Sequence, residues 1–223
     1  LQGEIESGDL LRLQRQYQSC RMDAAGNPNA ELFVDSPGGS VAEAMAIGAW
    51  VRHQKIDVWV PGDSVCFSSC VYILASGISK LPVGTVGIHR PFFTRRPGEE
   101  IGKSLRDLLQ RSRDFFDSMN VPKRLADEMF SVPPSEAKVL SRKELKAFRL
   151  FGMDMVAEEE ADIEELERSG ISREELHDRQ QVWRREINEC ILDFDAASPE
   201  YADCTYRAYL KRNRAWLPPE WLQ

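Results

Sequence analysis

Two adjacent serines, Ser68 and Ser69, stand between Cys66 and Cys70 in the segment SVCFSSC. The segment follows the strand-like run KIDVWVPG and precedes the apolar run VYILASG, so the serines lie where a strand turns into a helix. A serine at such a turn can cap the helix. It can also act as a nucleophile, with its hydroxyl exposed and the next N–H free to bind an oxyanion. The nucleophilic role requires a base that takes the serine proton.

The chain has three histidines that could serve as this base. His89 closes the strand-like run VGTVGIH, and a residue at the end of a parallel strand lies at the sheet edge where open α/β folds bind ligands. His53 ends a predicted helix, where histidines commonly cap carbonyl groups, and His177 lies in an acidic helical tail. His89 is therefore the candidate base.

A glycine turn, DSPGGSV at residues 35–41, precedes another predicted helix. Glycines allow close approach of a ligand, and a helix N-terminus adds positive partial charge, so the turn could hold a phosphate or an oxyanion. It lacks the sequence of a P-loop or a dinucleotide fingerprint, and the alternative is a tight turn without a ligand. Together, the glycine turn, the serine and the histidine share one sheet edge and predict a serine hydrolase site.

The elements that position these residues alternate between strand and helix over the first ~150 residues, which predicts an α/β fold with parallel strands and right-handed crossovers. Strands are expected at 30–36, 55–62 and 80–89, and helices at 41–53 and 69–77. Three further helices are expected at 100–119, 122–130 and 141–154, the last with an N-cap at Ser141 and a Glu three residues later.

The motifs DSPGGSV, CFSSCVYILASG and GIHRP, in this order, resemble the Clp protease proteolytic subunit and its relatives in the Clp/crotonase superfamily. The resemblance covers about residues 1–154 and implies a repeated ββα spiral core. It places Ser68, nine residues before Gly77, at the nucleophile position and His89 at the base position. It assigns the oxyanion-binding N–H groups to Gly39 and Ser69, and it implies no cofactor and no metal.

A closer resemblance is to exported bacterial Clp-like proteins, which carry a Cys-x-Ser-x-Cys box and begin with a motif seen here as GEIESGD. It suggests a local bridge between Cys66 and Cys70, although two buried thiols that only pack together are the alternative. Cys190 and Cys204 form a second candidate pair, because the intervening Ser-Pro suggests a turn between helices. Cys20 is left unpaired. Paired cysteines fit an exported, periplasmic protein, and a cytoplasmic protein with free thiols is the alternative.

The third member of a catalytic triad is where the sequence departs from the family. The family places an Asp shortly before the helix that begins here as LSRKEL, but this segment reads FSVPPSEAKV. The candidates that could orient His89 instead are Ser131, Ser135, Glu136 and Asp127. A Ser–His dyad without a third residue is the alternative.

Charge divides the chain into two predicted domains, a Clp/crotonase-like domain at 1–152 and an acidic helical extension at 153–223. The extension carries 18 Asp and Glu against 9 Lys and Arg, or −9, while residues 1–152 carry +2. Its apolar residues at helical spacing and its late tryptophans predict an element packed on the first domain: Trp183, Ile187, Ile191, Phe194, Trp216 and Trp221.

Net charge and hydropathy restrict the classes of function that the chain can have. A net charge of −7 argues against nucleic-acid binding, and no run approaches ~18 apolar residues, so no transmembrane segment is predicted. A first residue other than Met fits a processed mature protein or a trimmed sequence. The predicted function is a serine peptidase acting on short or unfolded polypeptides. The alternatives are an inactive Clp-fold assembly protein and a crotonase-like thioester enzyme. The resemblance also suggests a homo-oligomer formed through the helix at 101–119.

Overall fold

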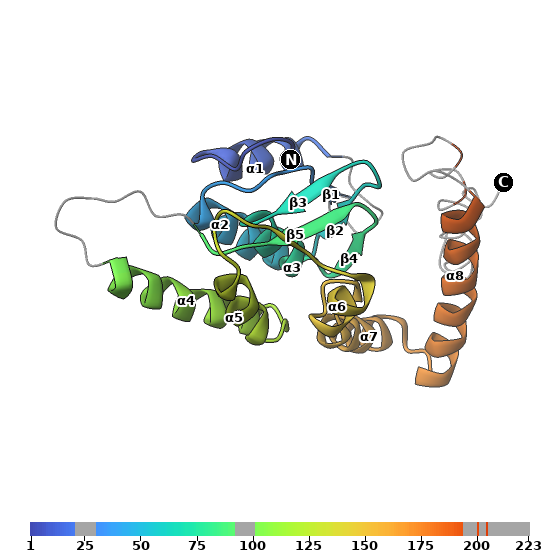
Figure 1. Cartoon of the computed structure of the whole chain (residues 1–223). Coiled ribbons are helices and arrows are strands. Elements are labelled where there is room, and N and C mark those ends of the chain that lie inside the picture. Colours follow the sequence, from blue (N-terminus) through green and yellow to red (C-terminus); the bar gives the residue numbers. More distant parts are fainter. Residues whose placement is uncertain (21–29, 92–100, 194–199, 201–203, 205–223) are drawn as a thin grey trace. The chain divides into compact units, whose positions relative to one another are not determined.

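The structure, a computed structural model, describes residues 1–20, 30–91, 101–193, Glu200 and Cys204. The chain forms two compact units, Leu1–Glu158 and Glu159–Gln223 (Figure 1). The boundary between these units lies inside helix α7 (Met155–Ser169), and the predicted domains 1–152 and 153–223 stay a prediction. The packing of the extension on the first unit stays a prediction.

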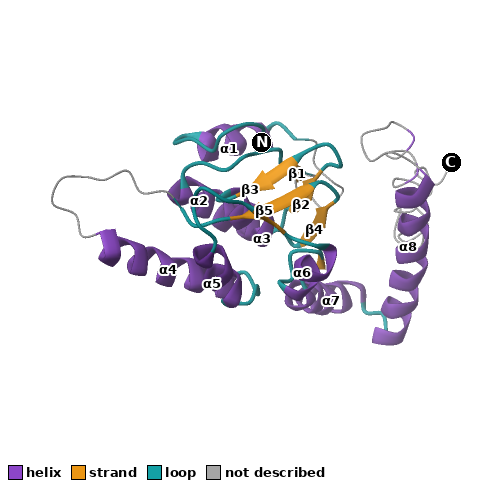
Figure 2. Cartoon of the chain, viewed as in Figure 1, coloured by secondary structure: helices purple, strands orange, loops and turns teal. Residues whose placement is uncertain are grey.

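The first unit is built from three consecutive ββα repeats. The first strand of each repeat (β1, β2 and β4, labelled in Figure 2) joins a four-stranded sheet of order β1-β2-β4-β7. The second strand joins a three-stranded sheet of order β3-β5-β6, to which the first repeat contributes only Ser36, bridged to Cys66. This arrangement confirms the repeated ββα core. The elements are β1 (Glu31–Phe33) and α2 (Val41–His53); β2 (Asp57–Val60), β3 (Val65–Phe67) and α3 (Cys70–Ser76); β4 (Ser79–Pro82), β5 (Thr85–Ile88) and α4 (Ile101–Ser118).

The strands within the repeats pair in parallel, as predicted, because helices connect them. After α5 (Arg124–Ser131), two short strands add antiparallel edges that the sequence did not reveal. β6 (Lys138–Val139) pairs with β5, and β7 (Gly152–Met153) pairs with β4.

Two predicted elements are corrected, and one helix was missed. The predicted strand 80–89 is two strands in different sheets, because a Cβ at Gly84 would lie 2.2 Å from the Pro61 carbonyl oxygen and the chain turns there in a space only glycine fits. The predicted helix 141–154 is only α6 (Arg142–Ala147), although its Ser141–Glu144 capping box is confirmed. Arg149 follows with a φ of 55°, a left-handed conformation that cannot continue a helix. Helix α1 (Asp9–Gln18) was not predicted.

Helix α3 lies at the centre of the core, and all of its residues are buried. Its Tyr72 ring stacks on Phe116 of α4 with ring centroids 4.8 Å apart, which fixes α4 against α3. Leu105 and Leu109 of α4, the helix through which an oligomer was predicted to form, are half-buried and pack on this core. Oligomer formation stays a prediction.

The second unit contains most of α7 and the helix α8 (Arg173–Asp193), which are separated at Gly170 with a φ of 67°. Arg173 forms a double hydrogen bond with Glu159 across this turn. The structure joins Cys190 to Cys204 with a Cα–Cα distance of 5.7 Å, which confirms the predicted pair. The predicted anchors lie outside the residues whose side chains are described: Trp183, Ile187, Ile191, Phe194, Trp216 and Trp221. None of the described helices has the length and apolar character needed to cross a membrane.

Candidate active site

The three candidate segments follow Ser36, β3 and β5, which neighbour one another at the small sheet. The backbone N–H of Phe67 donates to the Ser36 carbonyl (2.9 Å), and the N–H of Ser68 donates to the Gly87 carbonyl (3.0 Å). The glycine turn therefore follows Ser36, the two serines follow β3, and His89 follows β5. Because these strands are parallel, their carboxyl ends meet at one edge of the sheet.

Gly39, Ser68 and His89 line a single cavity of about 680 Å³. The glycine turn and the first turn of α2 form one wall, with Met45 farther along the helix. Pro91, two residues after His89 in the sequence, also lines the cavity, and α4 contributes Leu108 and Arg111. Glu4, from the N-terminal segment, completes the set. The cavity thus places a hydroxyl, an imidazole and a glycine turn around a space large enough for part of a peptide.

Ser68 occupies the turn between β3 and α3 with a φ of 56°. A non-glycine residue in the left-handed region is uncommon and costs energy, and such strained turns between a strand and a helix characterise nucleophile elbows. The adjacent N-cap residue, Ser69, makes no side-chain capping hydrogen bond to the helix. The structure therefore does not use these two hydroxyls as ordinary helix caps.

The glycine turn fits against the serine turn and needs both of its glycines. Gly38 has a φ of 106°, and a Cβ there would lie 2.8 Å from the Ser68 Cβ. Gly39 has a φ of 145°, and a Cβ there would lie 2.3 Å from the Ile5 carbonyl oxygen. The Ser69 hydroxyl donates to the Gly39 carbonyl (3.1 Å) and so ties the two turns together. The backbone N–H groups of Gly39 and Ser69 donate no hydrogen bond to any of the described residues.

The N-terminal motif GEIESGD supports the glycine turn from outside. Ile5 is buried, its N–H donates to the Gly38 carbonyl (2.7 Å), and its carbonyl accepts from Ser40 N–H (2.8 Å). Gly8 then begins α1, where its N–H donates to the Glu43 carboxylate of α2 (3.1 Å). The segment therefore fixes the backbone of Gly38 to Ser40.

His89 is half-buried, and its Nδ1 lies 2.9 Å from the carbonyl oxygen of Arg90. A carbonyl oxygen only accepts hydrogen bonds, so this contact requires a proton on Nδ1. In this tautomer of the neutral ring, the lone pair lies on Nε2. In serine proteases a carboxylate usually selects this tautomer, and here a backbone carbonyl makes the same selection.

The four candidates for a third triad residue are exposed or lie in other interactions. Asp127 pairs with Arg113 of α4 at 2.6 Å, and the Ser131 hydroxyl donates to the Glu128 carbonyl. Ser135 and Glu136 are exposed in the segment leading to β6, which runs beside the end of β5 because Arg90 N–H donates to the Val132 carbonyl (2.9 Å). The identity of a third residue stays a prediction, and a dyad oriented by the Arg90 carbonyl is the arrangement that the described contacts favour.

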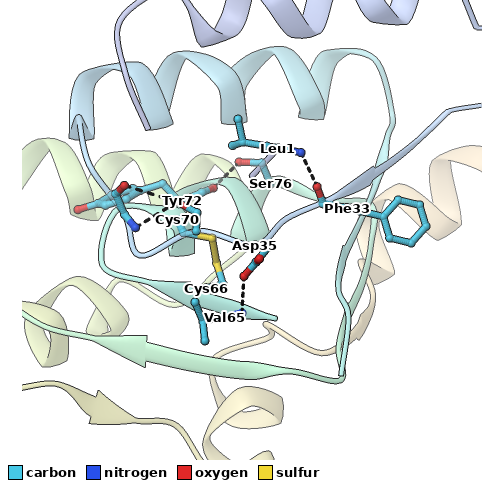
Figure 3. Close-up of a disulfide and its surroundings, with 10 residues drawn as sticks. Leu1, Phe33, Asp35, Val65, Cys66, Cys70, Tyr72 and Ser76 are labelled. Atoms are coloured by element: carbon cyan, nitrogen blue, oxygen red, sulfur yellow. Dashed lines mark hydrogen bonds between the residues drawn. A yellow bond between two sulfur atoms is a disulfide. The ribbon is translucent and has the colours of Figure 1, made fainter. Parts of the chain in front are cut away.

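A disulfide spans the serine turn. It joins Cys66 of β3 to Cys70, the first residue of α3, with a Cα–Cα distance of 5.2 Å (Figure 3). Both cysteines are fully buried, and the predicted bridge is therefore confirmed as part of the core. Nearby, the Asp35 carboxylate accepts a hydrogen bond from Val65 N–H (3.0 Å), so β3 is tied both to the segment before the glycine turn and to α3 (Figure 3).

Sequence reasoning missed the remaining cavity residues. Met45, Leu108 and Arg111 lie on helices that were assigned by their apolar face, and Glu4 belongs to the N-terminal motif that was matched only as a pattern. The three-residue spacing of Leu108 and Arg111 places them on one helix face and was the available signal. Among the described residues, no cluster of three or more His, Cys, Asp and Glu side chains could hold a metal ion.

Comparisons with known proteins agree with this geometry. The model of the Clp protease family matches residues 22–121, which contain both turns and His89. The chain is Clp-protease-like. No curated protein matches the sequence.

Among solved structures, a mutant of the 1510-N membrane-bound stomatin-specific protease is similar to this chain. It has 18% sequence identity and a TM-score of 0.50, and the match covers 68% of this chain and 74% of that one. A second mutant of that protease, in complex with a substrate peptide, has 18% identity, a TM-score of 0.49 and coverage of 68% and 70%. The first likeness shows that the fold is Clp/crotonase-like.

Proposed function

We propose that the protein is a serine peptidase that cleaves short or unfolded polypeptides by Ser–His catalysis. The observation that carries the proposal is the cavity that Gly39, Ser68 and His89 line together. The left-handed φ of Ser68 at the strand-to-helix turn supports its role as nucleophile. His89 is the base, because an imidazole accepts a proton readily, whereas a guanidinium such as that of Arg111, the other basic side chain in the cavity lining, is not a proton acceptor in proteins.

In the proposed reaction, Ser68 Oγ attacks the peptide carbonyl carbon while His89 Nε2 takes the hydroxyl proton. The N–H groups of Gly39 and Ser69 stabilise the resulting oxyanion. The C–N bond then breaks as His89 gives its proton to the leaving amine. A water molecule, activated by His89 in the same way, releases the acid and restores Ser68.

The Arg90 carbonyl orients the imidazole in this scheme but carries no full negative charge. It therefore stabilises the imidazolium less than a carboxylate would. Loss of the carboxylate function lowers turnover by about 10⁴-fold in the worked serine-protease case, so we expect slow turnover and a cavity suited to accessible peptides.

Hydrolysis of fluorescein-labelled, unfolded casein and of a quenched short peptide tests the proposal. The full chain should release product, and Ser68→Ala and His89→Ala should each reduce the rate by at least about 10³-fold. Ser40→Ala, which removes another hydroxyl from the same cavity, is the matched control and should retain activity. Activity that survives in Ser68→Ala would contradict the proposal.

We further propose that the protein is exported to an oxidising compartment such as the periplasm. Both disulfides, Cys66–Cys70 and Cys190–Cys204, support this location. Peptide mapping without reduction, on protein isolated from its native cells, should recover both pairs. Recovery of all four cysteines as alkylated thiols would contradict export.

A further inference from the structure

The cavity carries one charged group that the proposed reaction does not use as a reactant or a base. Arg111 lies in the lining three residues after Leu108, on the face of α4 that borders the candidate site. Its side chain forms no ion pair or hydrogen bond with the described residues, whereas Arg113, two residues later, is paired with Asp127. Arg111 is therefore available to a ligand in this cavity.

Buried contacts fix the position of this helix turn relative to Ser68. The Ser112 hydroxyl donates to the Leu108 carbonyl (2.8 Å), so the Tyr72 hydroxyl must be the donor in its 2.7 Å contact with Ser112. Tyr72 belongs to α3, the helix that directly follows the two serines. Burial raises the pKa of Tyr72 to about 12, so the phenol keeps the proton that this bond needs at neutral pH. The Leu108–Ser112 turn is thus held to the serine helix by a buried hydrogen-bonded chain.

The other charge in the cavity lining is Glu4, on the N-terminal segment beside Gly39. Glu4 and Arg111 form no ion pair with each other in the described structure. The two charges therefore stay separate, and the cavity has an acidic group near the glycine turn and a basic group on α4. A bound peptide would experience opposite local fields at these two places.

We propose that Arg111 is a specificity residue that favours peptide substrates with a carboxylate close to the scissile bond. The inference rests on the proposed function, because it places the peptide in the cavity that contains Ser68. The carboxylate comes either from an acidic side chain or from the C-terminus of a short peptide, and guanidinium chemistry recognises both. The apolar side chains of Met45 and Leu108 in the same lining contact the rest of the peptide.

Peptide binding to the full-length Ser68→Ala variant tests this inference without requiring turnover. Four fluorescein-labelled peptides of about ten residues, rich in Ala, Leu and Ser, are compared by fluorescence anisotropy. They carry one Glu or one Gln near the centre, each with a C-terminal carboxylate or a C-terminal amide. Comparison of the Glu and Gln peptides with amidated ends measures the preference for an acidic side chain. Comparison of the two Gln peptides measures the preference for a C-terminal carboxylate.

At least one of the two carboxylate sources should bind about 3- to 10-fold more tightly than its neutral counterpart. Arg111→Gln, added to Ser68→Ala, should remove that preference. The matched control Arg113→Gln removes the same charge outside the cavity lining and should retain it, and Glu4→Gln should not weaken binding of the acidic peptide. The preference should also decline between about 50 mM and 0.5 M salt, since Arg111 is solvent-exposed.

Equal affinity for all four peptides, a preference that survives in Arg111→Gln, or no binding at peptide concentrations up to roughly 1 mM would overturn the inference. These outcomes differ from failure of the proposed function. A protein that binds acidic peptides through Arg111 but does not hydrolyse them would support the specificity role and contradict the peptidase. Hydrolysis of neutral and acidic peptides at equal rates would support the peptidase and contradict the specificity role.

Discussion

The two turns that enter α2 and α3 border the same cavity but have different chemistry. The first, Pro37–Ser40, uses two glycines at positive φ and ends at Ser40, whose hydroxyl accepts the Glu43 N–H as a helix cap. The second uses Ser68, a residue with a side chain, at a positive φ, and Ser69 at its N-cap position makes no capping bond. The first turn thus places backbone N–H groups, whereas the second holds a hydroxyl in a strained position. This difference is the one that the proposed function requires, with oxyanion donors in the first turn and the nucleophile in the second.

Gly39→Ala should have the largest effect on stability among the changes in the two turns, since it disrupts the turn made of backbone. The new Cβ would lie 2.3 Å and 2.6 Å from the carbonyl oxygen and nitrogen of Ile5. We expect a loss of about 3 kcal/mol in the free energy of unfolding from this overpacking, measured by urea denaturation. Displacement of the oxyanion donor should lower the hydrolysis rate by at least about 100-fold.

Gly62→Ala is the control for that change, because its Cβ would meet only the Val83 side chain at 3.6 Å. It should change stability by no more than about 0.5 kcal/mol. A Gly39→Ala protein with the stability and the activity of Gly62→Ala would mean that the first turn is not fixed by close packing.

Removal of the Cys66–Cys70 bridge tests whether the second turn needs a covalent constraint that the first lacks. Replacement of both residues by Ala should destabilise the protein by about 2 kcal/mol on the chain-entropy model and should slow hydrolysis, because the bridge spans Ser68. Replacement of Cys190 and Cys204 should cost about 3 kcal/mol, since the loop is longer, without affecting the rate. If both double replacements change the hydrolysis rate equally, the Cys66–Cys70 bridge has no specific effect on the candidate site.

Ser68→Gly and Ser68→Ala measure the strain of the second turn directly. Both variants lack the hydroxyl, but only Gly adopts a φ of 56° without a steric cost. Ser68→Gly should therefore be more stable than Ser68→Ala by about 1 kcal/mol, as measured by thermal denaturation. If Ser68→Ala is the more stable of the two, the turn is not strained and its resemblance to a nucleophile elbow loses its physical basis.

Ser40→Ala should have the smallest effect. It removes an exposed N-cap and should cost about 0.5–1 kcal/mol in the free energy of unfolding, with hydrolysis within about threefold of the parent. A loss of hydrolysis comparable to that of Ser68→Ala would mean that the two turns do not divide their roles as described.

Sequence reasoning predicted the parts of the fold that depend on local pattern. Helix α2 was predicted with its observed bounds because its apolar residues recur at helical spacing, and both disulfides followed from cysteine spacing and family resemblance. The break at Gly84 and the end of α6 were missed, because they depend on close contacts and backbone angles set by tertiary packing. Helix α1 was missed because its sequence is largely polar, and its start depends on the distant carboxylate of Glu43.

The candidate site also contains both residues that the sequence predicted and groups that it did not. Gly39, Ser68 and His89 were found because motifs mark them and the parallel strand order places them on one edge. Arg111 and the carbonyl of Arg90 were not predicted as groups of the site. The first looks like part of a solvated helix face, and the second is a backbone group whose direction only the structure gives.

Covalent labelling with a fluorophosphonate probe, followed by mass spectrometry of the intact protein and of its peptides, tests the central claim most directly. The wild-type protein should gain one adduct, on Ser68, and Ser68→Ala should gain none. Ser69→Ala should still be labelled, at a rate reduced several-fold, because it keeps its backbone N–H and loses only the hydroxyl bond to Gly39. An adduct on Ser69, labelling of Ser68→Ala at the wild-type rate, or no labelling of the wild-type protein would contradict the account.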